Sequence, residues 1–124
     1  MRPPVESRQN TSLRAGVGLA PWSSQVKNFS AIRSPAAIVV GSADNIAPPG
    51  NHSTRFYNSI NQAEKLLAII SGEDHFFPQE SPANQPGSKY QIAWMKRFVD
   101  GDTRYNQFLV TDSRLSTFQS TAPF

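Results

Sequence analysis

Two residue types able to do acid–base chemistry follow two apolar segments of this sequence. Asp44 comes after the apolar run 36–40 and a Gly-Ser-Ala turn, and His75 comes after the apolar run 66–70 and the turn 71–74. A carboxylate that hydrogen-bonds an imidazole orients the ring and stabilises its cation, so the ring can take a proton. General-base chemistry is therefore one hypothesis. The other is two unrelated loop residues, because Asp and His occur often in loops.

Three apolar runs predict the strands that would bring Asp44 and His75 together. The run 15–19 is weak because it contains two glycines, whereas the runs 36–40 and 66–70 are strong. The strong runs are continuous rather than alternating, which is typical of parallel strands buried on both faces. Parallel strands joined by one crossover end on the same edge of the sheet. Asp44 and His75 are therefore expected at one edge.

Two helices are expected around these strands. In the segment 52–63, Phe56 and Ile60 stand four residues apart, as on one side of a helix. The segment 90–99 has one apolar stripe, which places Trp94 and Phe98 in the core. The glycine of Asp100-Gly101-Asp102 suits a left-handed helix end. The order of elements predicts an α/β fold with right-handed crossovers in a single domain.

The remaining segments are expected to be mainly loops. They are 21–35, the proline-rich stretch 72–88, and the tail 106–124, in which only 108–110 has extended character. Trp22 lies in the first of these, either as a lid on a pocket or as a plug over the core. His52 is expected to be a capping or surface histidine at the start of a helix.

Composition excludes several classes of protein. The 124 residues contain 12 Lys+Arg, 9 Asp+Glu and no cysteine. The absence of cysteine excludes disulfides, thiolate metal sites and a cysteine nucleophile. The basic residues are scattered rather than clustered, so nucleic-acid binding is not expected. No apolar run approaches the roughly 18 residues of a membrane span, and residues 1–7 lack the apolar segment of a signal peptide.

Several segments, in order, resemble the bacterial cutinases and poly(ethylene terephthalate) hydrolases. They are Leu19–Trp22, Asn28–Ser30, Asp44–Pro48, Phe56–Ser59, Gly72–Phe76, Ala93–Phe98 and Asp102–Tyr105. The run AWMKRFVDGDTRY is the most specific of these matches, and the resemblance extends from about residue 12 to residue 109. It implies a partial α/β-hydrolase fold: the C-terminal part of a parallel sheet, about three strands, with flanking helices.

The resemblance also implies roles for individual residues. Asp44 matches the acid and His75 the histidine of the family's Ser-Asp-His triad, which cleaves carboxylic esters and polyesters. Trp22 and Ile46 match positions that flank the bound acyl or aromatic unit, and Phe76 is a further candidate for that wall. The family's nucleophile lies in a Gly-x-Ser-x-Gly elbow, and no such motif occurs in this sequence.

The whole chain, residues 1–124, is therefore expected to be the C-terminal portion of a hydrolase domain that is inactive alone. Residues 1–11 are expected to be the remnant of the helix that follows the missing nucleophile. The alternative is a non-catalytic remnant or a fragment that binds an apolar ligand. The unpaired edge of the strand 15–19 is expected to favour self-association.

Accessory features follow from the same resemblance. Ser42 and Ser71 stand where heat-stable relatives bind calcium through carboxylates, so neither a metal site nor any other cofactor is expected. The expected substrate is an ester or polyester, and the expected location is extracellular, with no membrane or nucleic-acid partner.

Overall fold

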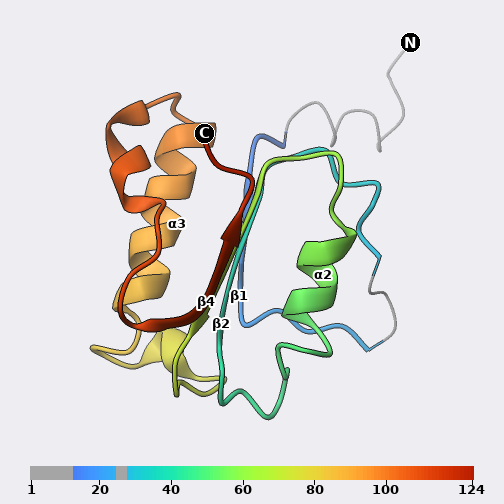
Figure 1. Ribbon diagram of the computed structural model, residues 1–124, viewed down its shortest axis with the longest axis vertical. Helices are drawn as coiled ribbons and strands as arrows, with labels where there is room; N and C mark the ends of the chain where they lie inside the picture. Colours follow the sequence, from blue (N-terminus) through green and yellow to red (C-terminus); the bar gives the residue numbers. More distant parts are fainter. Residues whose placement is uncertain (1–12, 25–27) are drawn as a thin grey trace.

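The computed structural model describes residues 13–24 and 28–124, which form one mixed sheet with helices on both faces (Figure 1). The strands lie side by side in the order β1 (Gly16–Leu19), β2 (Ala36–Gly41), β3 (Lys65–Ile70) and β4 (Leu115–Ser120). The first three strands are parallel, and β4 runs antiparallel to β3. The α/β class and the partial α/β-hydrolase arrangement are confirmed. About three strands were expected, and the structure adds a fourth, antiparallel one. Residues 1–11, expected to be a helix remnant, lie outside the described residues.

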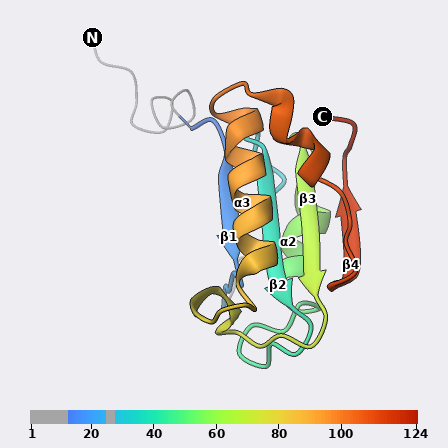
Figure 2. The ribbon, with the colours of Figure 1, turned by 90° about the vertical axis from the view of Figure 1, so that its left-hand side faces the viewer.

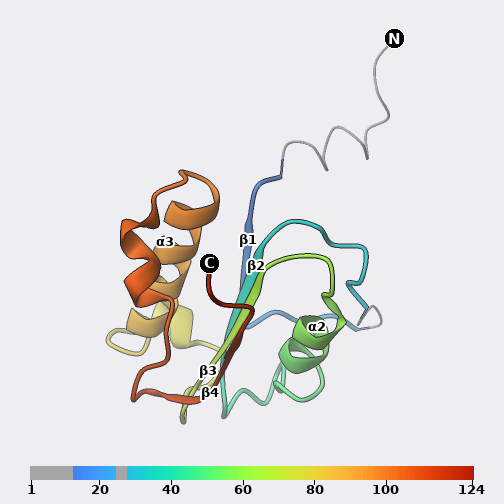
Figure 3. The ribbon, with the colours of Figure 1, turned by 45° about the horizontal axis from the view of Figure 1, so that its top comes forward.

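Helices cover the two faces of the sheet unequally (Figure 3). The longer helix α3 (Gln85–Phe98) and the 3-10 helix η2 (Thr103–Phe108) lie on one face, and α2 (Ser53–Ser59) lies on the other. A short 3-10 helix, η1 (Phe77–Gln79), precedes α3. Within the described ranges, no helix is long and apolar enough to cross a membrane. The sheet is thus the middle layer of three.

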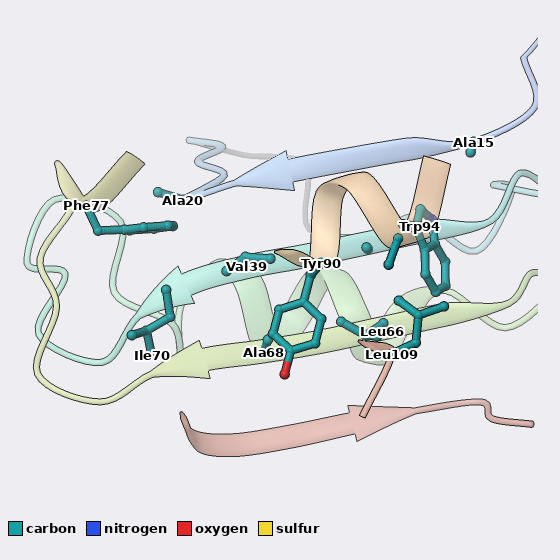
Figure 4. Close-up of a cluster of buried hydrophobic side chains, with 12 residues drawn as sticks. Ala15, Ala20, Val39, Leu66, Ala68, Ile70, Phe77, Tyr90, Trp94 and Leu109 are labelled. Atoms are coloured by element: carbon teal, nitrogen blue, oxygen red, sulfur yellow. The ribbon is translucent and has the colours of Figure 1, made fainter. Parts of the chain in front are cut away.

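Burial of both sheet faces explains the continuous apolar runs of β2 and β3. Successive side chains of a strand point to opposite faces, so each run supplies two cores. The core on the α3 side includes Ala37, Val39, Leu66, Ala68, Ile70, Phe77, Tyr90 and Trp94 (Figure 4). The core on the α2 side includes Ile38, Val40, Leu67, Ile69, Phe56 and Tyr57. The predicted two-sided burial is therefore confirmed, and so is the placement of Trp94, which is fully buried.

Helix α3 begins earlier than the sequence suggested. The expected start was Tyr90, after a loop over 72–88, but the helix starts at Gln85. Pro86 is compatible with this start because the first turn of a helix needs no hydrogen bond from that N–H group. The predicted apolar stripe is confirmed, since Tyr90 and Trp94 are buried and the ring centroids of Phe98 and Trp94 are 4.5 Å apart.

The C-terminal tail is more ordered than the sequence suggested. The expected extended segment 108–110 is wrong, because Phe108 is the last residue of the 3-10 helix η2 and residues 109–110 form a bend. The strand of this region is β4, which was missed because its sequence, LSTFQS, is mostly polar. As an edge strand it is buried only in part, and Leu115 and Phe118 pack against the α3-side core. Tertiary context rather than hydrophobic pattern thus determines β4.

Charged side chains link the segment just before β4 to α3. Asp112 accepts hydrogen bonds from the Nζ atom of Lys89 at 2.6 Å and from the guanidinium of Arg114 at 2.8 Å. The Arg114 hydrogen bond is the main reason that the pKa of Asp112 lies well below its usual range, and Lys89 acts in the same direction. Close by, the hydroxyl of Tyr90 donates to the carbonyl of Val110 at 2.6 Å. These contacts fix the connection between α3 and β4.

We predict that Asp112→Asn destabilises the fold at neutral pH by about 1 kcal/mol, a value reduced for partial exposure. A carboxyl whose pKa is lower in the folded state contributes stability above its unfolded pKa of about 4, and that contribution is lost as the pH falls further. The variant should therefore lose part of the wild type's dependence of stability on pH below pH 4. Urea unfolding at several pH values measures this. Asp100→Asn, which removes a longer, exposed pair with Lys96, is the control and should change little.

Candidate active site

Asp44 is fixed by the turn that follows β2. Its side chain is fully buried. The Oδ1 atom accepts hydrogen bonds from the backbone N–H groups of Ile46 at 2.9 Å and Ala47 at 2.7 Å. A carboxylate that bonds backbone groups two and three residues further on stabilises a tight turn. Because Oδ1 is occupied in this way, the position of the other oxygen, Oδ2, is determined by the local backbone.

His75 meets that second oxygen. The distance between its Nδ1 atom and Oδ2 of Asp44 is 2.8 Å, and a quarter of the histidine side chain is exposed. A carboxylate only accepts hydrogen bonds, so Nδ1 carries the proton. The other ring nitrogen, Nε2, then has its lone pair available, and none of the residues in 13–24 and 28–124 donates a hydrogen bond to it. This is the orientation that a general base requires.

The sheet explains why residues 31 positions apart meet. Asp44 follows β2 and His75 follows β3, and these parallel neighbours end at the same edge (Figure 2). The loops are also joined directly, because the Ala43 N–H group donates to the Glu73 carbonyl at 2.9 Å. The predicted hydrogen bond between the two side chains is therefore confirmed as geometry, whereas their catalytic roles remain a prediction.

The three candidate substrate-contacting residues follow three different strands at this same edge. Trp22 follows β1, Ile46 follows β2 and Phe76 follows β3, and roughly half of each residue is exposed. Phe76 lies edge-on to the imidazole of His75, with ring centroids 5.6 Å apart. Trp22 lines an apolar cavity of about 290 Å³ on the α2 side, which includes neither Ile46 nor Phe76. The three residues thus share an edge of the sheet, and Trp22 alone of the three lines this cavity.

His52 differs in part from the sequence-based expectation of a capping or surface histidine. It stands at the N-cap position of α2, but it is buried and its side chain makes no capping bond there. Its Nδ1 atom accepts a hydrogen bond from the Ser23 N–H group at 3.2 Å, and its ring stacks on Trp22 with centroids 5.9 Å apart. His52 therefore supports the exposed Trp22. Linear spacing gave no signal for this contact, because the two residues lie in different loops.

Comparisons with known proteins show the family to which the chain belongs. A sequence model of the family described as "PETase: PET hydrolase-like" matches residues 5–122. Cutinase 2 of Thermobifida cellulosilytica is 39% identical over 123 residues, covering 94% of this chain and 46% of that protein. Cutinase cut1 of Thermobifida fusca is also 39% identical over 123 residues, covering 94% of this chain and 38% of that protein. A bis(hydroxyethyl) terephthalate hydrolase of Streptomyces coelicolor is 35% identical, covering 83% of this chain and 33% of that protein.

The family follows from these matches together with the fold. A three-layer α/β sheet that brings an Asp and a His together at its carboxyl edge defines a hydrolase-like architecture. The chain belongs to the PET hydrolase-like family. It spans less than half the length of the curated relatives described above.

We predict different costs for removing the two partners of the Asp44–His75 pair. Asp44→Ala leaves the N–H groups of Ile46 and Ala47 without their acceptor, so it should lower the free energy of unfolding by about 1–3 kcal/mol. His75→Ala should cost less, because it leaves those bonds intact and lets water reach the carboxylate. Chemical denaturation of both variants measures the difference. An equal or larger loss for His75→Ala would contradict the structural role given to Asp44.

Proposed function

We propose that this chain supplies the acid and the base of a serine carboxylic ester hydrolase of the cutinase or polyester-hydrolase type. His75 is the base and Asp44 is the acid that orients it. The observation that carries the proposal is the hydrogen bond of 2.8 Å between Nδ1 and Oδ2, with Nε2 left available, in a member of the PET hydrolase-like family.

The proposed chemistry follows from that geometry. Nε2 of His75 takes the proton of a serine hydroxyl as the oxygen attacks the ester carbonyl. The imidazolium so formed is stabilised by Asp44 and then gives the proton to the leaving alcohol. In the second half of the cycle the same nitrogen activates water, which releases the acid from the acyl-enzyme. Asp44 stays fixed throughout, because its Oδ1 atom is held by two backbone N–H groups.

The serine is proposed to come from outside these 124 residues. The sequence contains no Gly-x-Ser-x-Gly elbow, and the curated relatives are more than twice as long as the part that aligns. The nucleophile and the oxyanion donors are therefore assigned to a separate segment of a complete domain. Losing the nucleophile of such a triad removes nearly all of the rate, so we propose that the 124 residues are inactive alone.

The substrate is proposed to be an ester or polyester, in line with the cutinase and terephthalate-ester hydrolase names of the relatives. Trp22, Ile46 and Phe76 offer exposed apolar side chains around the edge that carries His75, suited to an acyl or aromatic unit. Because such polymers are insoluble, we propose that the complete enzyme works outside the cell. Neither a metal nor another cofactor enters the proposed mechanism.

A chimaera tests this proposal. The part of Thermobifida fusca cutinase cut1 that precedes its aligned region would be fused to residues 1–124. We expect hydrolysis of p-nitrophenyl butyrate by the chimaera, none by the 124 residues alone, and a loss of at least about 10³-fold in the chimaera with His75→Ala. Asp100→Asn, distant from the pair in the chain and exposed, serves as the control.

Two outcomes would contradict the proposal. Turnover in the chimaera that survives His75→Ala would remove this histidine from the mechanism. A chimaera that folds, as shown by circular dichroism, but has no activity would favour the alternative, a non-catalytic fragment that binds an apolar ligand. The cavity of about 290 Å³ beside Trp22 is the observation behind that alternative.

Self-association through β1 is a second part of the proposal. The N–H group of Gly16 donates to the carbonyl of Pro35, just before β2, and the N–H group of Ala20 donates to the carbonyl of Val39 in β2. Because alternate residues of a strand point their backbone groups to opposite sides, Val17 and Leu19 direct theirs outward. Among the described residues, no strand pairs with that side of β1. An open edge of this kind is a template for pairing with another chain.

We predict that Val17→Pro weakens association of the 124-residue chain. Proline removes one outward N–H group and leaves the inward bonds to β2 intact. Sedimentation velocity over a range of concentrations should show a dimer for the wild type and a larger monomer fraction for the variant. Val17→Ala, which keeps the N–H group, is the matched control. A wild-type chain that stays monomeric at its highest soluble concentration would contradict this part of the proposal.

A further inference from the structure

A second cavity lies on the α3 side of the sheet, on the opposite face from the cavity beside Trp22. It has a volume of about 480 Å³ and lies where the end of β3, the start of α3 and the segment before β4 meet (Figure 2). A cleft of this size can hold a small organic molecule. None of the residues assigned to the acid–base pair or to the substrate wall lines this cavity.

The walls of the cavity are mostly apolar. Ile70 at the end of β3 and Pro86 in the first turn of α3 are buried, and Pro82 and Ala83 complete the apolar wall. Ala83 also packs against the α3-side core. Proline and alanine side chains lose little conformational entropy when a ligand covers them, so this wall suits the apolar body of a ligand.

One carboxylate in the lining has no partner. Glu73 is partly buried, and within 13–24 and 28–124 no group forms a hydrogen bond or an ion pair with its carboxylate. Its backbone is held in place, because its carbonyl accepts a hydrogen bond from the Ala43 N–H group at 2.9 Å. A charge beside an apolar wall loses part of its hydration, and a cation that bonds to it restores the lost interaction.

The other charged residue of the lining is already paired. The guanidinium of Arg114 donates to both carboxylate oxygens of Asp112, through Nη2 at 2.8 Å and Nε at 3.3 Å. Lys89 is the second cation that bonds Asp112, but it does not line the cavity. Among the described lining residues, the charge that is available to a ligand is therefore the negative charge of Glu73.

We infer that this cavity binds a small organic cation, an ammonium group on an apolar body, and that Glu73 pairs with the ammonium. The hydroxyl of Ser71 and the side-chain amide of Gln85 also line the cavity and can accept the remaining N–H groups. A metal ion needs several such ligands, and in the part of the chain that the structure describes no three Asp, Glu or His side chains gather to hold one. The inference is independent of the proposed ester hydrolysis.

The test uses three probes that share a phenylbutyl body and differ in charge. At neutral pH, 4-phenylbutylamine is a cation, 4-phenylbutan-1-ol is neutral and 4-phenylbutyrate is an anion. ¹H–¹⁵N spectra of the 124-residue chain, recorded during titration at low ionic strength, report which amides shift and at which concentration. We expect saturable shifts at Ser71, Glu73 and Ala83, with a dissociation constant for the amine on the order of 1 mM.

The preference among the probes is the decisive quantity. The amine should bind about 2- to 5-fold more tightly than the alcohol, as expected for a partly exposed ion pair, and the butyrate should bind most weakly. Salt at about 0.5 M should remove most of this difference, because it screens the charges.

Glu73→Gln tests the source of the preference. It should lower the affinity for the amine to that for the alcohol and leave the affinity for the alcohol unchanged, because only the charge is removed. Glu80→Gln removes an exposed carboxylate of the same loop that does not line the cavity, so this matched control should keep the wild-type preference. Ala83→Leu, which fills part of the cavity, should weaken the binding of all three probes.

Four outcomes would overturn the inference. Equal affinities for the amine and the alcohol at low ionic strength would show that charge is not recognised. Tighter binding of the butyrate would assign the cavity to Arg114 and an anion. Shifts confined to residues around Trp22 would place the probe in the other cavity, and an unchanged preference in Glu73→Gln would exclude this carboxylate. The first three are measured on the wild type and hold even if a variant does not fold, and an inactive chimaera would leave all four unaffected.

Discussion

The hydrogen bond between Asp44 and His75 is the contact on which the rest of the site depends. One partner is fully buried and the other is three-quarters buried, so the pair is only partly accessible to water and is not an ordinary surface contact. Burial of a carboxylate is costly unless its oxygens are hydrogen-bonded. Here both oxygens are bonded, one to two backbone N–H groups and one to the imidazole. The structure therefore stabilises a single ring orientation with Nε2 available.

The sheet brings Asp44 and His75 to the same edge, and contacts between the loops that carry them hold the two side chains together. Apolar side chains on both faces of β2 and β3 bury the strands between α3 and α2, so the two strand ends have little freedom relative to each other. Parallel pairing then places both loops at one edge. The last adjustment is local: the loop before His75 packs on Gly41, and the segment after it ends in a buried phenylalanine. The strands bring the two groups to one edge of the sheet, and the loops that carry them are in contact there.

The sequence predicted the strands that are buried on both faces of the sheet. It did not predict the elements and contacts that depend only on packing against the rest of the fold. The continuous runs 36–40 and 66–70 predicted the central strands and, through them, the meeting of Asp44 and His75. Strand β4 could not be predicted, because its mostly polar sequence carries no burial signal until β3 lies beside it. The stacking of His52 on Trp22 joins two loops whose relative position no spacing encodes. Gly41 was expected in the turn after the strand 36–40, whereas it is the last residue of β2 and lies against the backbone of Glu73.

A double-mutant cycle between Asp44 and His75 tests the central claim most directly. The free energies of unfolding of Asp44→Asn, His75→Gln and the double variant, compared with the wild type, give the coupling between the two side chains without any assay of turnover. The account predicts a favourable coupling of about 1–3 kcal/mol, the range for a hydrogen bond to a charged group. Single-variant effects that add to within about 0.3 kcal/mol would show that the two side chains do not interact, and would contradict it.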